Sequence, residues 1–191
     1  SVNKKITKFI NNYYSVQNKA YYLPNCLEKK ITSKEYIKYT AKKNKKKIVI
    51  GAMGRLVDKK GFHYLIDAIK ELPDTQLLIA GDGPCYKKLK DKIKDISNIE
   101  MLGWISNKED FFKKIDIFCL SSTFEPFGIV LIEAMARGIP VVSTKCYGPV
   151  DIIKNNYNGL LVKKASTKEL SYGIKVLKGN YMLRKKISKN S

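Results

Sequence analysis

Short apolar runs alternate with segments of helical periodicity from Ile48 onward, and this alternation constrains the fold more than any other feature of the sequence. The runs are continuously apolar, which is typical of strands buried on both faces of a parallel sheet. Because crossovers between parallel strands are right-handed, the pattern predicts an α/β domain built on a doubly wound parallel sheet. The expected strands are 48–53, 76–80, 99–102, 115–120, 140–143 and 159–162, and the expected helices are 61–71, 85–96, 107–114, 126–137, 149–154 and 167–178.

The chain of 191 residues is long enough for one such domain with an appendage and too short for two. Residues 2–14 have helical spacing, a short apolar run follows at 20–23, and Pro24-Asn25 predicts a turn. We therefore divide the chain into residues 1–22, a helix with a linker, and residues 23–191, the main domain. After the last expected helix, residues 184–191 are predicted to form a polar tail.

The chain has a net charge of +20, and nearly all of the excess is lysine. Arginines are three of the 37 basic residues, and Lys is accompanied by abundant Ile, Asn and Tyr, all of which have codons rich in A and T. Genome composition therefore explains much of the lysine excess. The first interpretation of these lysines is that they are solvated surface residues without a specific partner. Attraction to an anionic membrane surface is the second interpretation, and nucleic-acid binding is the weakest.

The cysteines favour a reducing compartment. Cys26, Cys85, Cys119 and Cys146 are widely spaced, without a C-x-x-C pair or a His-rich cluster, so no zinc site is expected. Cys119 lies in an apolar run and is predicted to be a buried core residue. The sequence also lacks an uncharged apolar run long enough to span a bilayer, which favours a soluble, cytoplasmic chain.

Two cations follow the first expected strand, at the edge where a doubly wound sheet binds its ligand. Gly54 allows a tight turn, Arg55 offers a planar donor fork, and Lys60 directly precedes the next expected helix. Cations that converge beside a helix N-terminus form an anion site suited to a diphosphate. Solvated surface charge is the alternative interpretation.

The next two strand ends carry weaker signals. Residues 81–84, Gly-Asp-Gly-Pro, predict a compact turn between strand and helix, for which a purely structural role is favoured. Trp104 and Ile105 follow the third strand, where their main chain can meet a planar ligand such as a nucleobase. A simple strand exit is the alternative.

The fourth strand end carries two glutamates. Pro126 fits the first turn of the expected helix 126–137, which would leave the amides of residues 127–129 free to bind an anion. Glu133 is the one charge in the apolar stretch 129–136, and its alternative role is a salt bridge to a lysine. Glu125 precedes it by eight residues, about 12 Å along a helix, which is the length of a diphosphate with a sugar at either end.

Four motifs occur together in this order: G-R-L-x3-K-G at 54–61, G-D-G-P at 81–84, E-P-F-G-x4-E at 125–133 and G-x-P-V-V at 138–142. The combination resembles the C-terminal, donor-binding domain of retaining GT-B glycosyltransferases of family 4, also called group 1. The resemblance implies one Rossmann-like half of a GT-B fold and a hexosyltransferase activity in lipopolysaccharide or cell-envelope glycan biosynthesis.

The resemblance also implies a role for each site residue. Arg55 and Lys60 would neutralise the diphosphate of a nucleotide sugar. Glu133 would bind the ribose and Glu125 the donor sugar, which makes these two the catalytic candidates. The other substrate-binding residues would be Gly54, Trp104, Ile105, Phe127, Gly128 and Ile129.

The family pattern implies partners outside this chain. Residues 1–14 resemble the last helix of an N-terminal acceptor domain, with Pro24-Asn25 at the hinge. The family's C-terminal helices, which cross back to that other domain, are not predicted in this sequence. The acceptor would be a glycan or a lipid-linked glycan, at the inner face of a membrane. No cofactor and no metal is expected, because cations and helix dipoles would stabilise the leaving group. Asp151 stands where relatives carry Glu and receives no role, and His63 is expected to be an ordinary helix residue.

Two other functions remain open from the residues. GT-B folds also serve nucleotide-sugar epimerases and phosphorylases, although the spacing of the two glutamates disfavours both. A basic nucleic-acid-binding module is the remaining alternative, and steep loss of binding with salt would identify it.

Overall fold

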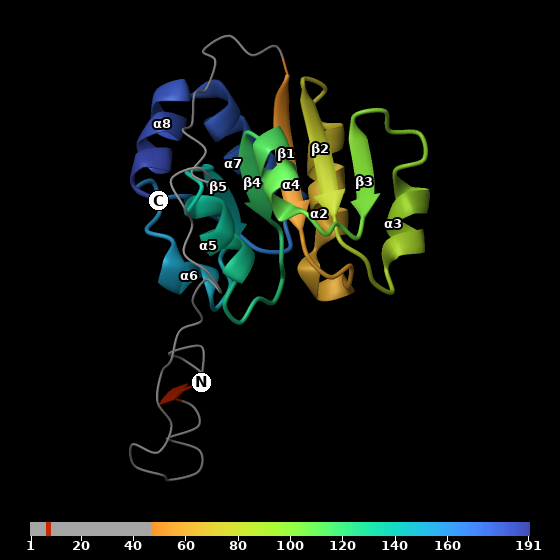
Figure 1. The fold of residues 1–191 in the computed structure, drawn as a ribbon, viewed down its shortest axis with the longest axis horizontal. Coiled ribbons are helices and arrows are strands. Elements are labelled where there is room, and N and C mark those ends of the chain that lie inside the picture. Colours follow the sequence, from red (N-terminus) through yellow and green to blue (C-terminus); the bar gives the residue numbers. More distant parts are fainter. Residues whose placement is uncertain (1–6, 9–46) are drawn as a thin grey trace.

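The computed structural model describes residues 7–8, which are helical, and residues 47–191. The sequence predictions for residues 1–6 and 9–46, including most of the expected N-terminal helix and the hinge at Pro24-Asn25, lie outside the described residues. Within the described part, six strands form one parallel sheet in the order β3-β2-β1-β4-β5-β6 (Figure 1). The predicted doubly wound sheet is confirmed.

Every expected strand is present, with bounds that differ from the prediction by at most two residues. Long apolar runs explain this agreement, since they are buried whichever face of the sheet their side chains meet. The strands are β1 Ile48–Met53, β2 Thr75–Ala80, β3 Ile99–Gly103, β4 Ile117–Leu120, β5 Val141–Thr144 and β6 Leu160–Val162.

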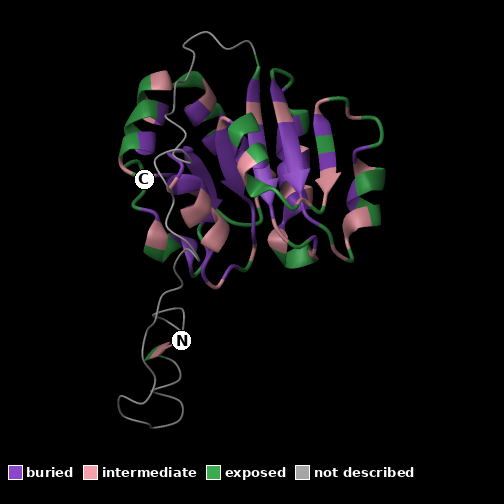
Figure 2. Cartoon of the chain, viewed as in Figure 1, coloured by how far each residue is buried: buried purple, intermediate pink, exposed green. Residues whose placement is uncertain are grey.

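The helices cover both faces of the sheet and expose their outer sides (Figure 2). One face carries α2, α3, α7 and α8, and the other carries α4 and α5. The bounds are η1 Asp58–Lys60, a 3-10 turn, α2 Phe62–Lys70, α3 Tyr86–Lys92, α4 Lys108–Lys114, α5 Ile129–Met135, α6 Pro149–Ile152, α7 Thr167–Gly179 and α8 Tyr181–Lys189.

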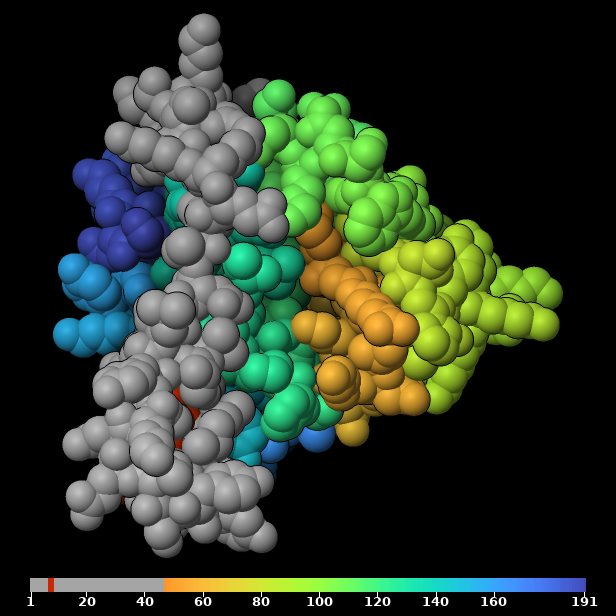
Figure 3. Space-filling model, turned by 60° about the horizontal axis from the view of Figure 1, so that its bottom comes forward, coloured from red at the N-terminus to blue at the C-terminus, as the bar shows by residue number. Residues whose placement is uncertain are grey.

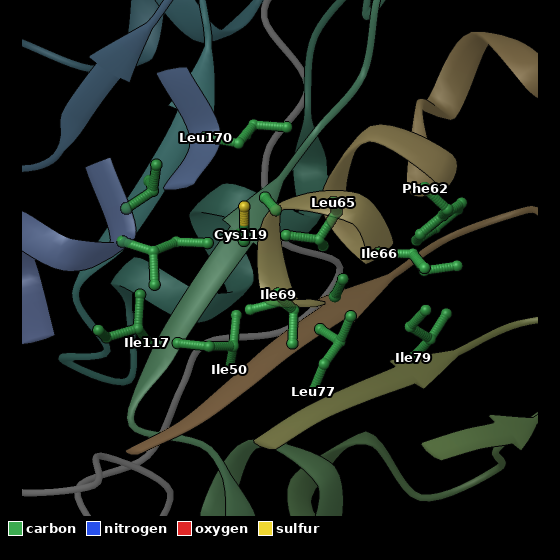
Figure 4. Close-up of a cluster of buried hydrophobic side chains, with 14 of the residues drawn as sticks. Ile50, Phe62, Leu65, Ile66, Ile69, Leu77, Ile79, Ile117, Cys119 and Leu170 are labelled. Carbon is green, nitrogen blue, oxygen red and sulfur yellow. The ribbon is translucent and has the colours of Figure 1, made fainter. Parts of the chain in front are cut away.

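The core has one apolar layer on each face of the sheet. Figure 4 shows the layer around α2, where Leu65 and Ile69 meet Ile50 and Cys119 from the strands. Cys119 is buried there as predicted, and burial raises the pKa of its thiol to about 12. The second layer is built on Phe112 and the apolar side of α5. Together the layers fix the sheet that carries the site.

The predicted polar tail is wrong, because residues 181–189 form the helix α8. Ile187 is fully buried, and the Arg184 side chain turns inward, with an exposed fraction of 3%. Its Nη1 donates to the carbonyl oxygens of Leu177 and Lys178, at 2.5 and 2.6 Å. The arginine therefore satisfies carbonyls at the end of α7 that the helix itself leaves open. Across residues 7–8 and 47–191, no helix is both long and apolar enough to cross a bilayer.

Candidate functional site

A cavity of about 580 Å³ opens at the C-terminal edge of the sheet, where β1, β2 and β3 end. Figure 3 turns this edge toward the reader, and the orange atoms belong to the segment that follows β1. The three strands end side by side, so the loops after them form a common wall. The lining residues are Met53, Gly54, Arg55, Gly81, Asp82, Gly83, Trp104, Ile105, Ser106, Lys108 and Val130.

Main-chain hydrogen bonds join these loops directly. The Gly54 amide donates to the carbonyl of Ala80, and the Gly81 amide donates to the carbonyl of Gly103 at 2.7 Å. Gly81 has a φ of +135°, and a Cβ at this position would collide with the carbonyl oxygen of Gly54. Glycine is therefore required for the two loops to touch, which rigidifies the wall of the cavity.

Arg55 and Trp104 belong to the wall. Arg55 is exposed, and among the described residues it forms none of the ion pairs, so its guanidinium is free to bind a ligand. Trp104 is 80% exposed although it is the single tryptophan of the chain. A large exposed aromatic at a cavity indicates a ring-binding surface rather than a core residue.

Lys60 and Glu125 form an ion pair outside the cavity wall, between η1 and the loop after β4. The Lys60 Nζ lies 2.5 Å from Glu125 Oε2, and Glu125 is 6% exposed. Ser122 Oγ donates to the same carboxylate oxygen at 3.4 Å. The loop is fixed in turn, because Ser121 Oγ donates to the carbonyl of Lys60 at 3.0 Å. The predicted diphosphate cation and the predicted sugar carboxylate thus contact each other.

The expected helix 126–137 is shorter than predicted. Gly128 has a φ of +96° and caps α5, which begins at Ile129, so Pro126 and Phe127 lie in the preceding turn. A left-handed residue interrupts the helix, which makes the estimate of 12 Å of helical rise between Glu125 and Glu133 invalid. Phe127 and Gly128 are buried, and Ile129 is half-buried at the first turn.

Glu133 meets a lysine that the sequence analysis did not identify. Lys108 Nζ lies 2.7 Å from Glu133 Oε1, and Lys108 also lines the cavity. Glu133 Oε2 is buried without a hydrogen-bond partner among the described residues. The salt bridge considered as an alternative for Glu133 is therefore present. It occupies one carboxylate oxygen and leaves the other unsatisfied, which is costly unless a ligand donates to it.

A second ion pair holds α4 against α5. Arg137 lies one helical turn beyond Glu133, and its guanidinium contacts the Glu109 carboxylate through Nε at 3.1 Å and through Nη2. The same guanidinium lies over the Phe112 ring, 4.6 Å from its centroid. Consecutive residues of α4, Lys108 and Glu109, thus bind Glu133 of α5 and Arg137 of the turn that follows α5.

The structure divides the predicted site residues into two neighbouring groups. Four line the cavity, and six lie beside it, one on η1 and five on the loop after β4 or on α5. Sequence reasoning missed Lys108, because a lysine in so lysine-rich a chain gives no signal, and it treated 81–83 as a structural turn although these residues also line the cavity. The cavity group is Gly54, Arg55, Trp104 and Ile105, and the other group is Lys60, Glu125, Phe127, Gly128, Ile129 and Glu133.

A doubly wound sheet with a cavity, an exposed arginine and lysine-paired glutamates at its C-terminal edge defines a Rossmann-like ligand-binding domain. The family model described as glycosyl transferases group 1 matches residues 33–191. The chain therefore belongs to this family, and its fold is one half of a GT-B fold. Membership favours the glycosyltransferase interpretation over an epimerase or a nucleic-acid-binding module.

Named relatives agree with this assignment. The lipopolysaccharide core biosynthesis glycosyltransferase LpsE of Rhizobium meliloti is 34% identical over 143 residues, 73% of this chain and 42% of that protein. Anabaena HepE, solved with UDP and glucose, superposes with a TM-score of 0.72 at 28% identity over 76% of this chain and 42% of its own. The C-terminal domain of LpcC from Francisella tularensis superposes with a TM-score of 0.67 at 29% identity, over 75% of this chain and 81% of that domain. The chain thus spans about two fifths of the curated relatives it matches.

Proposed function

We propose that this chain is the donor-binding half of a retaining family 4 glycosyltransferase and binds a nucleoside-diphosphate sugar. The observation that carries the proposal is the cavity with Arg55 at its wall, an arginine without an ion pair among the described residues. Two ion pairs, Lys60–Glu125 and Lys108–Glu133, accompany it. Cations suit a diphosphate, and carboxylates suit the hydroxyls of two sugars. A nucleotide sugar carries both kinds of group in one molecule.

We propose an orientation for the donor that this arrangement supports. The base would lie in the cavity against Trp104 and Ile105, and the ribose hydroxyls would donate to the unsatisfied oxygen of Glu133. The diphosphate would lie at Arg55 and Lys60, and the transferred sugar at Glu125 with the amides before α5. When the donor binds, Lys60 would leave Glu125 and pair with phosphate oxygens instead. The Glu125 carboxylate would then be free to bind the sugar.

The cations also have a role in the reaction. Breaking the bond between sugar and phosphate leaves negative charge on the nucleoside diphosphate, and fixed positive groups stabilise that charge as it develops. Arg55 and Lys60 supply these groups, so we propose that neither a metal nor another cofactor takes part. Addition of a chelator should leave nucleoside diphosphate affinity unchanged, and a loss of affinity restored by Mg²⁺ would contradict this.

The domain that supplies most of the acceptor site is proposed to lie in the remainder of a longer enzyme. We propose an N-terminal acceptor domain and a hexose transferred to a glycan or lipid-linked glycan of the cell envelope, in the cytoplasm at the inner face of the membrane. The name of LpsE, which refers to lipopolysaccharide core biosynthesis, supports this class of acceptor. The lysine-rich surface would suit anionic lipid headgroups, and nucleic acid is not a proposed partner.

The single tryptophan provides the test. Trp104 lies at the cavity, so its fluorescence should respond when UDP, GDP or ADP binds, and the full chain can be titrated with each. UDP is the first choice because HepE was solved with it. We expect one diphosphate to bind more tightly than its own nucleoside. A chain whose fluorescence and heat of binding respond to none of the three would refute the proposal.

A further inference from the structure

Two aromatic side chains lie exposed beside Glu125 and have no part in the donor site. Phe124 directly precedes Glu125 and is 41% exposed, and Tyr147, from the loop after β5, is 43% exposed. Their rings pack edge to face with centroids 5.8 Å apart. Single exposed aromatics are common, but an ordered pair beside a candidate site indicates a contact surface.

A lysine completes this surface. Lys59 Nζ lies 5.8 Å from the centroid of the Phe124 ring. The Lys59 carbonyl accepts from the amide of Thr123 at 2.8 Å, and the Gly148 amide donates to the carbonyl of Glu125 at 2.9 Å. These bonds join η1 and the loops after β4 and β5. We call the group of Lys59, Phe124 and Tyr147 the aromatic platform. The hydrogen bonds fix its position relative to Glu125.

The order of the strands places the platform relative to the donor. The cavity lies over the ends of β1, β2 and β3, whereas the two aromatic residues of the platform follow β4 and β5, on the other side of β1 in the sheet (Figure 1). Adjacent strands are about 4.8 Å apart, so β5 is about 10 Å from β1, roughly one sugar ring beyond the diphosphate cations. With the donor oriented as proposed, the base and ribose lie on the cavity side of β1, and a ring beside the donor sugar lies on the platform side.

We propose that the aromatic platform is an acceptor subsite that binds a pyranose ring. The axial C–H bonds of a pyranose make one face of the ring apolar and weakly positive, which suits the negative faces of Phe124 and Tyr147. Lys59 donates to hydroxyls or to an acidic group at the edge of that ring. This inference rests on the proposed function, since it requires a donor sugar at Glu125.

Saturation-transfer NMR on the full chain tests the subsite. The probes are the methyl α-glycosides of glucose, galactose, mannose and N-acetylglucosamine, each measured with UDP present. We expect at least one glycoside to receive saturation at its C–H protons. In Phe124→Ala and Tyr147→Ala this transfer should fall at least about fivefold, as expected when one aromatic contact is lost.

Tyr157→Ala is the matched control. Tyr157 is 47% exposed and has Lys154 Nζ 5.2 Å from its ring centroid, so it has the chemistry of the platform at a distant turn. This variant should keep the full signal. Equal losses in Phe124→Ala and Tyr157→Ala, or no transfer to the unmodified chain, would overturn the proposal.

Three further measurements separate the explanations. UDP binding, followed by Trp104 fluorescence, should persist in both platform variants, and its absence from the unmodified chain would refute the proposed function instead. Loss of the glycoside signal in Glu125→Gln with retention in Phe124→Ala would place the sugar in the donor site and overturn the subsite. Sedimentation of Phe124→Ala should match the unmodified chain. A change in oligomeric state would assign the platform to contact between copies and likewise overturn it.

Discussion

At the scale of single residues, Lys60 and Lys108 place a cation against each candidate glutamate. The two pairs differ in what they leave open. Glu125 receives Lys60 and Ser122 on the same oxygen, whereas Glu133 has one oxygen on Lys108 and one buried without a partner among the described residues. A ligand hydroxyl at Glu133 would satisfy a group that is already dehydrated, so we expect Glu133 to contribute more to ground-state binding.

The two glutamates should therefore respond differently to loss of charge. Glu133→Gln should weaken both the free nucleoside diphosphate and the nucleotide sugar, because both carry the ribose. Glu125→Gln should affect mainly the nucleotide sugar, and in a complete enzyme mainly turnover. Calorimetry with both ligands on both variants measures this. If Glu125→Gln abolished diphosphate binding and Glu133→Gln did not, the proposed orientation of the donor would be reversed.

Arg55 and Lys60 should each contribute to diphosphate binding the free energy of a hydrogen bond to a charged group. Arg55→Ala and Lys60→Ala should each weaken nucleoside diphosphate binding by about 1.5–3 kcal/mol, with little effect on the nucleoside. Arg55→Ala is the cleaner variant, because Lys60→Ala also leaves the buried Glu125 without its cation. Lys88→Ala, which removes an exposed lysine paired with Asp58, is the matched control and should bind normally. Equal losses for nucleoside and diphosphate would point to a damaged fold.

At the scale of elements, the strands were predictable and two helix ends were not. Apolar runs identify buried strands without tertiary information, which is why β1 to β6 agree with the prediction. The start of α5 depends on Gly128 adopting a left-handed conformation, whereas Pro126 in the sequence suggested an earlier start. Residues 184–191 were too polar to indicate a helix, because the burial of Arg184 becomes evident only once α7 is in place.

The pairing of Lys108 with Glu133 was hidden for the same kind of reason. Its geometry depends on α4 packing against α5, and the clamp between Glu109 and Arg137 is a tertiary contact. By contrast, the positions of Arg55 and Trp104 at the cavity followed from their place after strands. Residues at strand ends are thus readable from the sequence, and partners across helices are not.

Arg184 should be the main polar determinant of α8 stability. Arg184→Met keeps the buried stem and leaves two carbonyl groups of α7 without their donor, so we expect a loss of about 2–3 kcal/mol in the free energy of unfolding. Urea denaturation measures the change. The neighbouring Lys185→Met removes an exposed cation and should be almost neutral. Similar losses for both variants would show that Arg184 does not act through those carbonyls.

At the scale of the whole molecule, we expect the chain to bind nucleoside diphosphates without catalysing sugar transfer. The described residues build the cavity that is proposed to bind the donor, and the acceptor domain and the second wall of the site are proposed to lie elsewhere in the enzyme. The chain should therefore bind nucleoside diphosphates weakly and transfer no sugar to added acceptors. Incubation with a radiolabelled nucleotide sugar and cell-envelope glycans measures this, with donor hydrolysis followed in parallel. Sugar transfer by the chain alone would contradict the proposed division of labour.

The strand order has a consequence for the chain as the ribosome makes it. β1 lies between β2 and β4, so Ile50 pairs with Ile117 although β2 and β3 are synthesised in between. Until β4 leaves the exit tunnel, the nascent chain presents an unpaired β1 edge of Ile, Val, Gly, Ala and Met to its surroundings. That interval is when this domain is most open to chaperones and to aggregation, and it closes when Ile117–Leu120 emerges.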